Sequence, residues 1–362
     1  MERKLYRKLI ALLVILGITT SSVLPIQTFA AEQNVKTSLQ QQKHLGAGEF
    51  QDVMEKNASS MLVMDSYART ILEEKDVSFA GINSISQELK KSILTHQVDT
   101  RTNATYWLNN MKPHMMQVNN DIVNYSVTFQ TYYNDLLTAI NRQDTNTLKT
   151  KLEELHYSIL NNKKKTDQLL NELISLRNKM TVDTQNLKRD VDGVTTVLTS
   201  QDMGIPLLEQ QINRYNDLIK KSKDMIIAGG VLCATGILCI AGGPMIAEAK
   251  KNISYAEQEI RMLQSKITAS QAEVVNLTNL KNQVSYLSDT IDVAITSLQN
   301  ISNQWHTIGA KYNNVLQNVE SMSPADFVFI KEDLNVAKDS WKDLEDYAKK
   351  LNEGARKMEK EL

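Results

Sequence analysis

Apolar residues recur at coiled-coil spacing along most of the chain. From Ile246 onward they fill two rows of a heptad repeat. After Leu277 one extra step of three leads to Leu280, and the repeat then resumes as far as Met322. A continuous helix over residues 246–322 would be roughly 115 Å long at ~1.5 Å per residue. The pattern therefore predicts a rod built from very long helices.

Similar apolar stripes, each with a polar opposite face, lie elsewhere in the chain. They predict helices near residues 50–71, 115–136, 152–187, 208–219 and 327–351. Breaks between helices are expected at 76–81, 141–146, 204–206 and 323–326. In the last break Ser323 can cap a helix and Pro324 can take its first position, while Pro113 is expected to kink its helix. The predicted fold is all-α, an elongated bundle of about five long antiparallel helices.

One segment does not fit a water-soluble bundle. Residues 225–247 are 23 consecutive positions without a charge, apolar on every face. As one helix they would span ~34 Å, enough for a ~30 Å hydrocarbon core, and as a β hairpin turning near Gly236 their arms would nearly reach across. The sequence does not choose between helix and hairpin. The flanks favour a membrane role, because long cationic side chains at both ends can reach lipid headgroups. These are Lys220, Lys221, Lys223, Lys250 and Lys251.

The alternative is that this segment stays buried as a hairpin tip or small capping subdomain. A bundle two or three helices thick has little interior for it, and exposing it to water costs ~25 cal/mol per Å². We therefore expect a membrane-seeking head at 225–247, between bundle parts 31–224 and 248–362, that folds against neighbouring helices in water and swings out at a bilayer. The residues expected to contact lipid are Met225, Ile226, Ile227, Val231, Leu232, Ile237, Leu238, Ile240, Met245 and Ile246. The expected hinge residues are Gly229, Gly230, Gly242, Gly243 and Pro244.

The two cysteines of the chain, Cys233 and Cys239, lie inside this segment. On a helix their Cα atoms would be ~9 Å apart, too far for a disulfide, whereas in a hairpin centred on Gly236 they would face each other. Unpaired thiols that act as small apolar residues are the favoured interpretation, and pairing is the alternative.

Residues 1–30 have the pattern of a secretory signal peptide. A basic start is followed by an uncharged apolar core, and Thr28 and Ala30 place small residues where a signal peptidase cuts. Cleavage after Ala30 is favoured over cleavage after Ala31. A retained membrane anchor is disfavoured, because it needs ~20 apolar residues. The mature chain would carry 37 basic and 41 acidic groups, a net charge of −4 that attracts neither nucleic acid nor anionic lipid strongly.

Residue patterns that carry chemistry are missing from the sequence. The five histidines are isolated, and none has a cysteine or second histidine at metal spacing. Nucleotide-binding and nucleophile motifs do not occur, so we expect no enzyme activity, cofactor or metal. Tyr125, Phe129, Tyr132 and Tyr133 would suit a sugar- or choline-binding platform, but their heptad spacing favours core packing.

Several stretches spread over the expected mature chain resemble the Bacillus tripartite pore-forming enterotoxins. The resemblance is strongest to the non-haemolytic enterotoxin branch of this family and next strongest to haemolysin BL. The stretches that carry it are AEQNVK (31–36), MDSYA (64–68), YWL (106–108), MKP (111–113), IAGGVLC (227–233), AGGPMIA (241–247), LQNISNQW (298–305), GAKYNN (309–314), FIKEDL (329–334) and AKDSWK (337–342).

The resemblance implies a cytolysin A-like bundle with its apolar head between two helices. It also implies two other secreted components as partners, assembled with this chain on host cell membrane lipid into a lytic hetero-oligomeric pore, and no catalytic residues. A wall around a wet lumen needs one polar face, which residues 225–247 lack, so we expect this chain to dock and anchor while its partners line the pore. The alternative is a secreted structural or adhesin-like coiled coil held at the bacterial surface.

Overall fold

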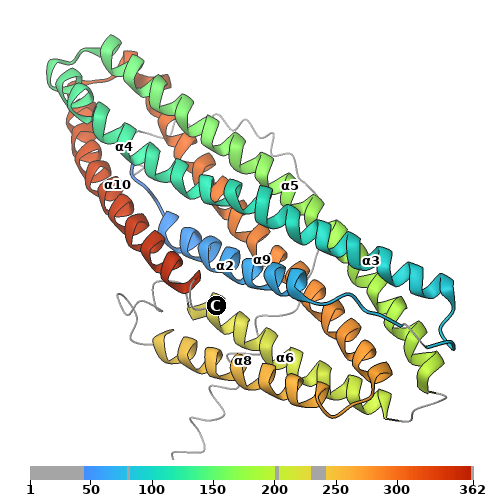
Figure 1. Ribbon diagram of the computed structural model, residues 1–362. Helices are drawn as coiled ribbons and strands as arrows, with labels where there is room; N and C mark the ends of the chain where they lie inside the picture. Colours follow the sequence, from blue (N-terminus) through green and yellow to red (C-terminus); the bar gives the residue numbers. More distant parts are fainter. Residues whose placement is uncertain (1–44, 80–81, 200–203, 230–241, 360–362) are drawn as a thin grey trace, which may run out of the picture. The chain divides into compact units, whose positions relative to one another are not determined.

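The computed structural model describes residues 45–79, 82–199, 204–229 and 242–359. They belong to one compact unit, residues 39–362. The described residues are almost entirely helical and contain no strand. In chain order the elements are α2 (Phe50–Glu73), α3 (Gln87–Tyr106), the π-helical turn η2 (Trp107–Met111), α4 (Lys112–Arg142), α5 (Thr145–Thr199), α6 (Ile205–Gly229), α8 (Gly242–Gln264), α9 (Ala269–Asn318), the 3-10 turn η3 (Val319–Ser321) and α10 (Pro324–Glu359), as Figure 1 shows.

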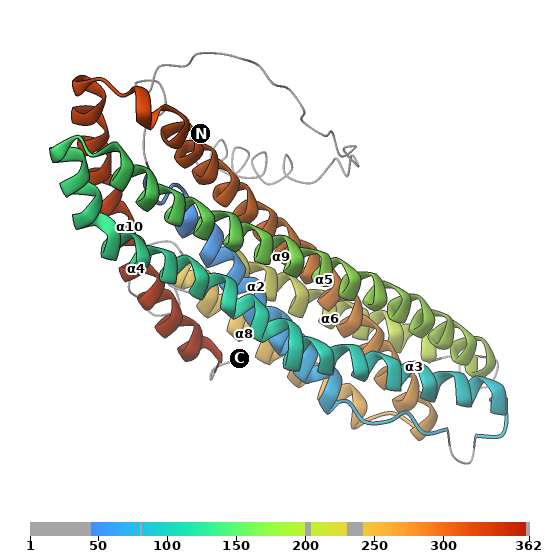
Figure 2. The ribbon, with the colours of Figure 1, turned by 90° about the horizontal axis from the view of Figure 1, so that it is seen from above.

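The long helices pack side by side, and they confirm the predicted all-α bundle. α5 lies against α9, α4 packs against both α5 and α10, and α2 packs against α9 (Figures 1 and 2). α5 has 55 residues, which is ~80 Å of helix at ~1.5 Å per residue. A helix of that length is stabilised by packing its apolar stripe against neighbours along its whole length.

The predicted stripes form the core of the bundle. On α5 the buried apolar positions recur at heptad spacing and coincide with the stripe expected from the sequence. They are Leu148, Leu152, Leu155, Ile159, Leu169, Leu173, Leu176, Met180, Leu187, Val191, Val194 and Leu198. Asn162 and Thr166 interrupt the apolar row, and both are buried and hydrogen-bonded to backbone carbonyls.

Aromatic rings from four helices meet in the core. Phe50 of α2 lies 4.8 Å from Trp305 of α9, measured between ring centroids, and Tyr125 of α4 lies 4.6 Å from Trp341 of α10. Phe129 also lies close to Trp341, with 6.3 Å between their centroids. Core packing is therefore confirmed for Tyr125 and Phe129, which are fully buried and cannot present a binding platform.

The predicted continuous helix over residues 246–322 is wrong. α8 ends at Gln264, the chain turns, and α9 begins at Ala269. Thr268 caps α9, because its side chain accepts a hydrogen bond from the backbone of Gln271 and the Gln271 side chain accepts one from the backbone of Thr268. The heptad phase happens to persist through the turn, which is why the apolar pattern alone did not reveal it.

The other predicted breaks lie between helices. α4 ends at Arg142 and α5 begins at Thr145, with Gln143 in the left-handed region at φ 52°. Ser323 and Asp326 form reciprocal hydrogen bonds at the start of α10, where Pro324 takes the first position as predicted. Pro113 lies in the first turn of α4, directly after the π-helical turn η2. The expected kink at Pro113 stays a prediction.

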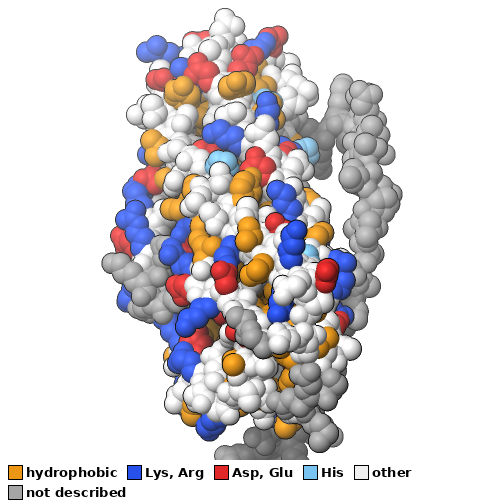
Figure 3. Space-filling view, turned by 45° about the vertical axis from the view of Figure 1, so that its right-hand side comes forward, with side chains coloured by type: hydrophobic (Ala, Val, Ile, Leu, Met, Phe, Trp, Pro, Cys, Tyr) orange, Lys and Arg blue, Asp and Glu red, His pale blue; other side chains and the backbone are white. Residues whose placement is uncertain are grey.

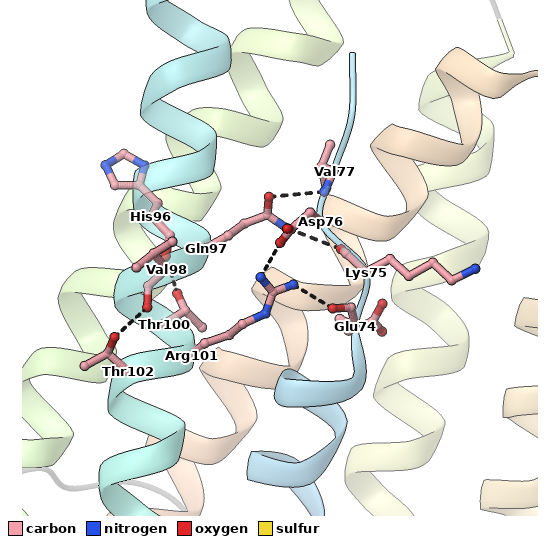
Figure 4. Close-up of polar contacts among 10 residues, drawn as sticks. All are labelled: Glu74, Lys75, Asp76, Val77, His96, Gln97, Val98, Thr100, Arg101 and Thr102. Atoms are coloured by element: carbon pink, nitrogen blue, oxygen red, sulfur yellow. Dashed lines mark hydrogen bonds and ion pairs between the residues drawn. The ribbon is translucent and has the colours of Figure 1, made fainter. Parts of the chain in front are cut away.

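Residues 74–79, between α2 and α3, run extended beside α3 and are fixed by side chains (Figure 4). Arg101 of α3 binds the Asp76 carboxylate and donates to the backbone carbonyl of Glu74 at 2.6 Å. The side-chain oxygen of Gln97 accepts from the backbone N–H of Val77 at 3.2 Å. From α9, Glu273 accepts from the backbone N–H of Ser78 at 3.0 Å. Side chains of α3 and α9 thus satisfy backbone groups that no sheet pairs.

α6 and α8 form a hairpin with its own apolar contact. Ile212 and Ile219 of α6 pack with Ala256 and Ile260 of α8, and Val275 of α9 completes this cluster. Tyr215 lies 6.3 Å from Tyr255 between ring centroids. In Figure 1 the two helices run side by side below the rest of the bundle. The hairpin therefore has apolar cohesion of its own.

The face of the molecule drawn in Figure 3 is mixed in charge. Figure 3 shows basic and acidic side chains interspersed over one face, with hydrophobic side chains in small groups between them. This agrees with 41 basic and 42 acidic residues in the whole chain. The face in that view therefore carries no large field of one sign.

Candidate functional site at the root of the apolar segment

Five of the residues predicted to contact lipid lie in described helices. On α6, Ile226 is buried in the core, and Met225 and Ile227 are half-buried against it. On α8, Ile246 is buried, while Met245 is 38% exposed. In this form the two ends of the uncharged segment are packed into the protein, and of these five side chains Met245 is the most exposed.

The other predicted lipid contacts lie outside the described residues, namely Val231, Leu232, Ile237, Leu238 and Ile240. Gly230, Cys233 and Cys239 also lie outside them, so the thiol prediction is untested. Among the expected hinges, Gly229 is buried at the end of α6, and Gly242, Gly243 and Pro244 form the first turn of α8. A proline suits that position, because the first N–H groups of a helix have no intrahelical acceptor. The hinge role stays a prediction.

A groove of about 780 Å³ runs between α2, the end of α6 and α9. Ile227, Ala228 and Gly229 form one side of it, directly before the residues that the structure does not describe. Val293 of α9 adds apolar surface that is 39% exposed. The groove therefore places an open, partly apolar surface beside the point where the uncharged stretch leaves α6.

Charged side chains also line this groove. Lys220 of α6 lies 3.3 Å from Asp224 and 3.5 Å from Asp289 of α9, measured from the amine to the carboxylate oxygens. Burial raises the pKa of Asp289, although the Lys220 charge opposes that shift. Asp52 and Glu55 of α2 also face the groove. The Lys220–Asp289 ion pair thus connects α6 to α9 next to the apolar segment.

Lys223 occupies an unusual position one turn before Ile226. Its amine lies 3.7 Å above the ring centroid of Tyr67 of α2, and the side chain is only 5% exposed. Burial lowers the pKa of the Lys223 amine to about 7, partly opposed by the Glu257 carboxylate of α8. The sequence pattern predicted that Lys223 would be among the lysines that reach lipid headgroups, and in this form its side chain is instead enclosed.

The position of Lys223 in the apolar pattern of α6 indicates that its side chain is buried. Ile212, Ile219 and Ile226 repeat every seven residues on the buried side of α6, and Lys223 falls four after Ile219 on the same side. Lys221, by contrast, faces solvent. A lysine in the buried row would have distinguished Lys223 from its neighbours.

A metal site is not assembled in the described part of the chain. No three His, Cys, Asp or Glu side chains lie together there in a way that could hold a metal ion. His96 pairs with Asp190 and His114 with Glu172, in separate places along α3, α4 and α5. No helix in the described ranges is both long enough and apolar enough to cross a membrane.

The fold is shared with components of pore-forming toxins. A soluble component of the tripartite alpha-pore forming toxin Smh of Serratia marcescens, SmhA, superposes with a TM-score of 0.70 at 13% identity, covering 88% of this chain and 98% of that chain. The soluble AhlB component of the Aeromonas hydrophila toxin AHL superposes with a TM-score of 0.67 at 14% identity, over 85% of this chain and 93% of that chain. These likenesses define the class of fold, a bundle of long helices that SmhA and AhlB share.

Sequence similarity identifies the family more specifically than the fold does. The HblL1 toxin component of Bacillus cereus is 30% identical, with a TM-score of 0.80 over 85% of this chain and 97% of that chain. A Bacillus cereus protein described as uncharacterized in the hblA 3' region is 30% identical over 157 residues, 42% of this chain and 98% of that protein. The sequence model of the Bacillus haemolytic enterotoxin (HBL) family matches residues 44–222. The chain belongs to this enterotoxin family, and membership favours the toxin interpretation over the adhesin alternative.

Proposed function

We propose that this protein is a secreted subunit of a multicomponent pore-forming toxin. In this proposal it assembles with two partner components on the membrane of a host cell. Support comes from its membership of the enterotoxin family and from the similarity to HblL1, a toxin component. Its role is structural rather than catalytic, in keeping with the similarity to toxin components.

The observation that carries the membrane role is the position of the uncharged segment in the fold. The chain leaves the end of α6 at Gly229 and returns at Gly242 to start α8, and these two helices pack against each other as a hairpin. The 12 intervening residues, 230–241, carry no charge. One end of the hairpin thus carries a stretch whose transfer from water to lipid is favourable.

Ile226 and Ile246 are buried where the uncharged segment leaves α6 and enters α8. Contact between these two side chains and lipid therefore requires this end of the hairpin to move. We expect residues 225–247 to act as one membrane-seeking unit, with Gly229, Gly230, Gly242 and Gly243 providing the backbone freedom. Since this stretch has no polar face, it suits an anchor in lipid better than the wall of a wet pore. In this proposal the partner components line the lumen.

The test is to replace residues 230–241 with a Gly/Ser loop of equal length, which leaves the described helices intact. Flotation with liposomes should be lost, while the far-ultraviolet circular dichroism should match that of the parent. The matched control removes exposed apolar surface elsewhere, as the double variant Val98→Ser and Val182→Ser, and should float like the parent. A loop-replaced protein that floats as well as the parent would refute the membrane role.

A further inference from the structure

The seam between the α6–α8 hairpin and the rest of the bundle has a polar stretch beside the apolar contacts that Ile226 and Ile246 make with the core. Three side-chain hydrogen bonds join α6 to α9 in succession. They run from Asn282 to Asn213 at 2.9 Å, from Gln283 to Asn216 at 3.3 Å, and from the Tyr286 hydroxyl to Asp217 at 2.7 Å. Water can replace each of these hydrogen bonds, so their net contribution to holding α6 in place is small.

Several polar atoms in this seam are buried without a hydrogen-bond partner among the described residues. They include the hydroxyl oxygens of Tyr67 and Ser222 and the side-chain nitrogen of Asn216. Each such atom loses its hydration when α6 packs against α2 and α9, and regains it when α6 leaves. These unsatisfied atoms weaken the seam, whereas Ile212, Ile219, Ala256 and Ile260 give the hairpin an apolar contact of its own.

Burial of the Lys223 amine disfavours the docked hairpin more strongly than burial of these neutral polar atoms does. Its amine faces the Tyr67 ring on α2, and within the described residues no carboxylate pairs with it at ion-pair distance. The other charged or titratable groups nearby are Lys220 and Asp224 on α6 itself, Glu257 on α8, and Tyr286 and Asp289 on α9. Of these groups, Glu257 exerts an attractive effect on the amine, but it is too weak to offset the burial.

We propose that Lys223, whose amine is enclosed over the Tyr67 ring with no paired carboxylate among the described residues, sets how readily the α6–α8 hairpin leaves α2 and α9. The inference rests on the proposed function in one respect: the hairpin carries the uncharged stretch at 225–247. Its departure would uncover Ile226 and Ile246 for contact with lipid.

The direction of the pH dependence follows from linkage. A lysine in water has a pKa near ~10.4, and burial lowers the pKa of Lys223 to about 7. Between those values the departed hairpin holds one more proton than the docked hairpin. Each unit of falling pH therefore favours departure by about tenfold, and the effect levels off below pH ~7. At neutral pH the departure of the hairpin is therefore close to its most favourable, and alkaline pH favours the docked hairpin.

A buried thiol can report departure in solution without a membrane. Ser222→Cys places a probe in the closed seam, since Ser222 is fully buried and its hydroxyl has no hydrogen-bond partner among the described residues. Cys233 and Cys239 are replaced by serine in every protein of the series. The rate of labelling by a thiol reagent is divided by the rate of a denatured reference at the same pH, which removes the titration of the thiol itself.

With Lys223 present, protection of the probe thiol introduced by Ser222→Cys should rise more than tenfold from pH 7 to pH 8.5. Lys223→Met, which keeps the length of the side chain, should give high protection at both pH values. Lys223→Arg, which stays charged, should give low protection at both. The matched control Lys221→Met removes an exposed neighbouring lysine and should keep the parent's pH dependence.

A Lys223→Met protein that retains the parent's pH dependence would overturn the proposal, and so would a Lys221→Met protein that loses it. If Lys223→Met fails to fold, the comparison of Lys223→Arg with Lys221→Met decides. The proposal predicts that Lys223→Arg loses the pH dependence of protection, whereas a purely packing role for Lys223 predicts that it keeps it. Since no membrane is present, failure here leaves the liposome result for the 230–241 replacement standing, and the reverse also holds.

Discussion

The Nδ1 atom of His96 lies 2.7 Å from an oxygen of Asp190 and thereby joins α3 to α5. The Asp190 side chain is almost fully buried, and burial raises its pKa. His96→Ala leaves that carboxylate without its short hydrogen bond. We expect the free energy of unfolding at pH 7 to fall by about 1–3 kcal/mol, measured by urea denaturation.

The control for His96 is His114, whose contact with Glu172 is 3.4 Å long and exposed. His114→Ala should change the stability by less than about 0.5 kcal/mol. The raised pKa of Asp190 also predicts how the stability deficit of His96→Ala depends on pH. Between pH ~5 and the ordinary aspartate pKa near ~3.9, the Asp190 carboxyl takes up its proton in the folded protein before it does in the unfolded chain, so the stability deficit of His96→Ala should shrink over that range. A deficit that grows between pH ~5 and pH ~4 would contradict this assignment.

The two core tryptophans differ in their polar contacts. The indole N–H of Trp341 donates to the backbone carbonyl of Leu45 at 3.0 Å, whereas that of Trp305 has no partner among the described residues. Both rings are fully buried. Trp341→Phe therefore loses a hydrogen bond as well as ring area, while Trp305→Phe loses ring area and removes an unsatisfied N–H.

We expect Trp341→Phe to lower the free energy of unfolding by about 1–2 kcal/mol more than Trp305→Phe does, in the same denaturation assay. Tryptophan fluorescence of each variant should confirm that the remaining rings stay buried. Equal losses in the two variants would show that the Leu45 contact adds no stability.

Most of the bundle could be predicted from the sequence, because long amphipathic stripes allow few other ways to bury their apolar faces. The turn near Thr268 was missed for a physical reason. The apolar rows of α8 and α9 keep the same phase, so Ile260 and Val274 fit one repeat although they lie on different helices. The local signal was the Thr268 and Gln271 capping pair, which the heptad count ignores.

The candidate site was predictable only in part. A long run without charge can be recognised from the sequence alone, so residues 225–247 could be predicted as a distinct segment. In the structure this segment begins in the last turns of α6 and ends in the first turns of α8. The contact of Lys223 with Tyr67 joins positions 156 residues apart in the chain, and a single sequence holds no record of such a pairing. The spacing indicates that Lys223 faces inward, but which helix it meets depends on the tertiary arrangement.

Arg101 should control the order of the extended segment 74–79. It binds the Asp76 carboxylate and the Glu74 carbonyl, and its charge strengthens both contacts, whereas the neutral Gln97 amide makes longer ones at 3.2 and 3.5 Å (Figure 4). Arg101→Ala should raise the rate of limited proteolysis within residues 74–86 by several-fold, because local opening exposes the backbone. Lys91→Ala, on the exposed side of α3, is the control and should leave the rate unchanged. Cleavage at an unchanged rate in Arg101→Ala would show that Val77 and Phe79, both buried, hold the segment without it.

The turn between α8 and α9 depends on the Thr268 cap. Its side chain accepts from the Gln271 backbone at 3.3 Å, and the Gln271 side chain accepts from the Thr268 backbone at 2.9 Å. Thr268→Ala leaves an unsatisfied N–H at the start of a 50-residue helix and should lower the free energy of unfolding by about 1 kcal/mol, whereas Thr268→Ser should be nearly neutral. Gln271→Ala removes the reciprocal contact and should cost less than Thr268→Ala. If Thr268→Ser were as unstable as Thr268→Ala, the methyl group rather than the hydroxyl would be the stabilising part of the cap.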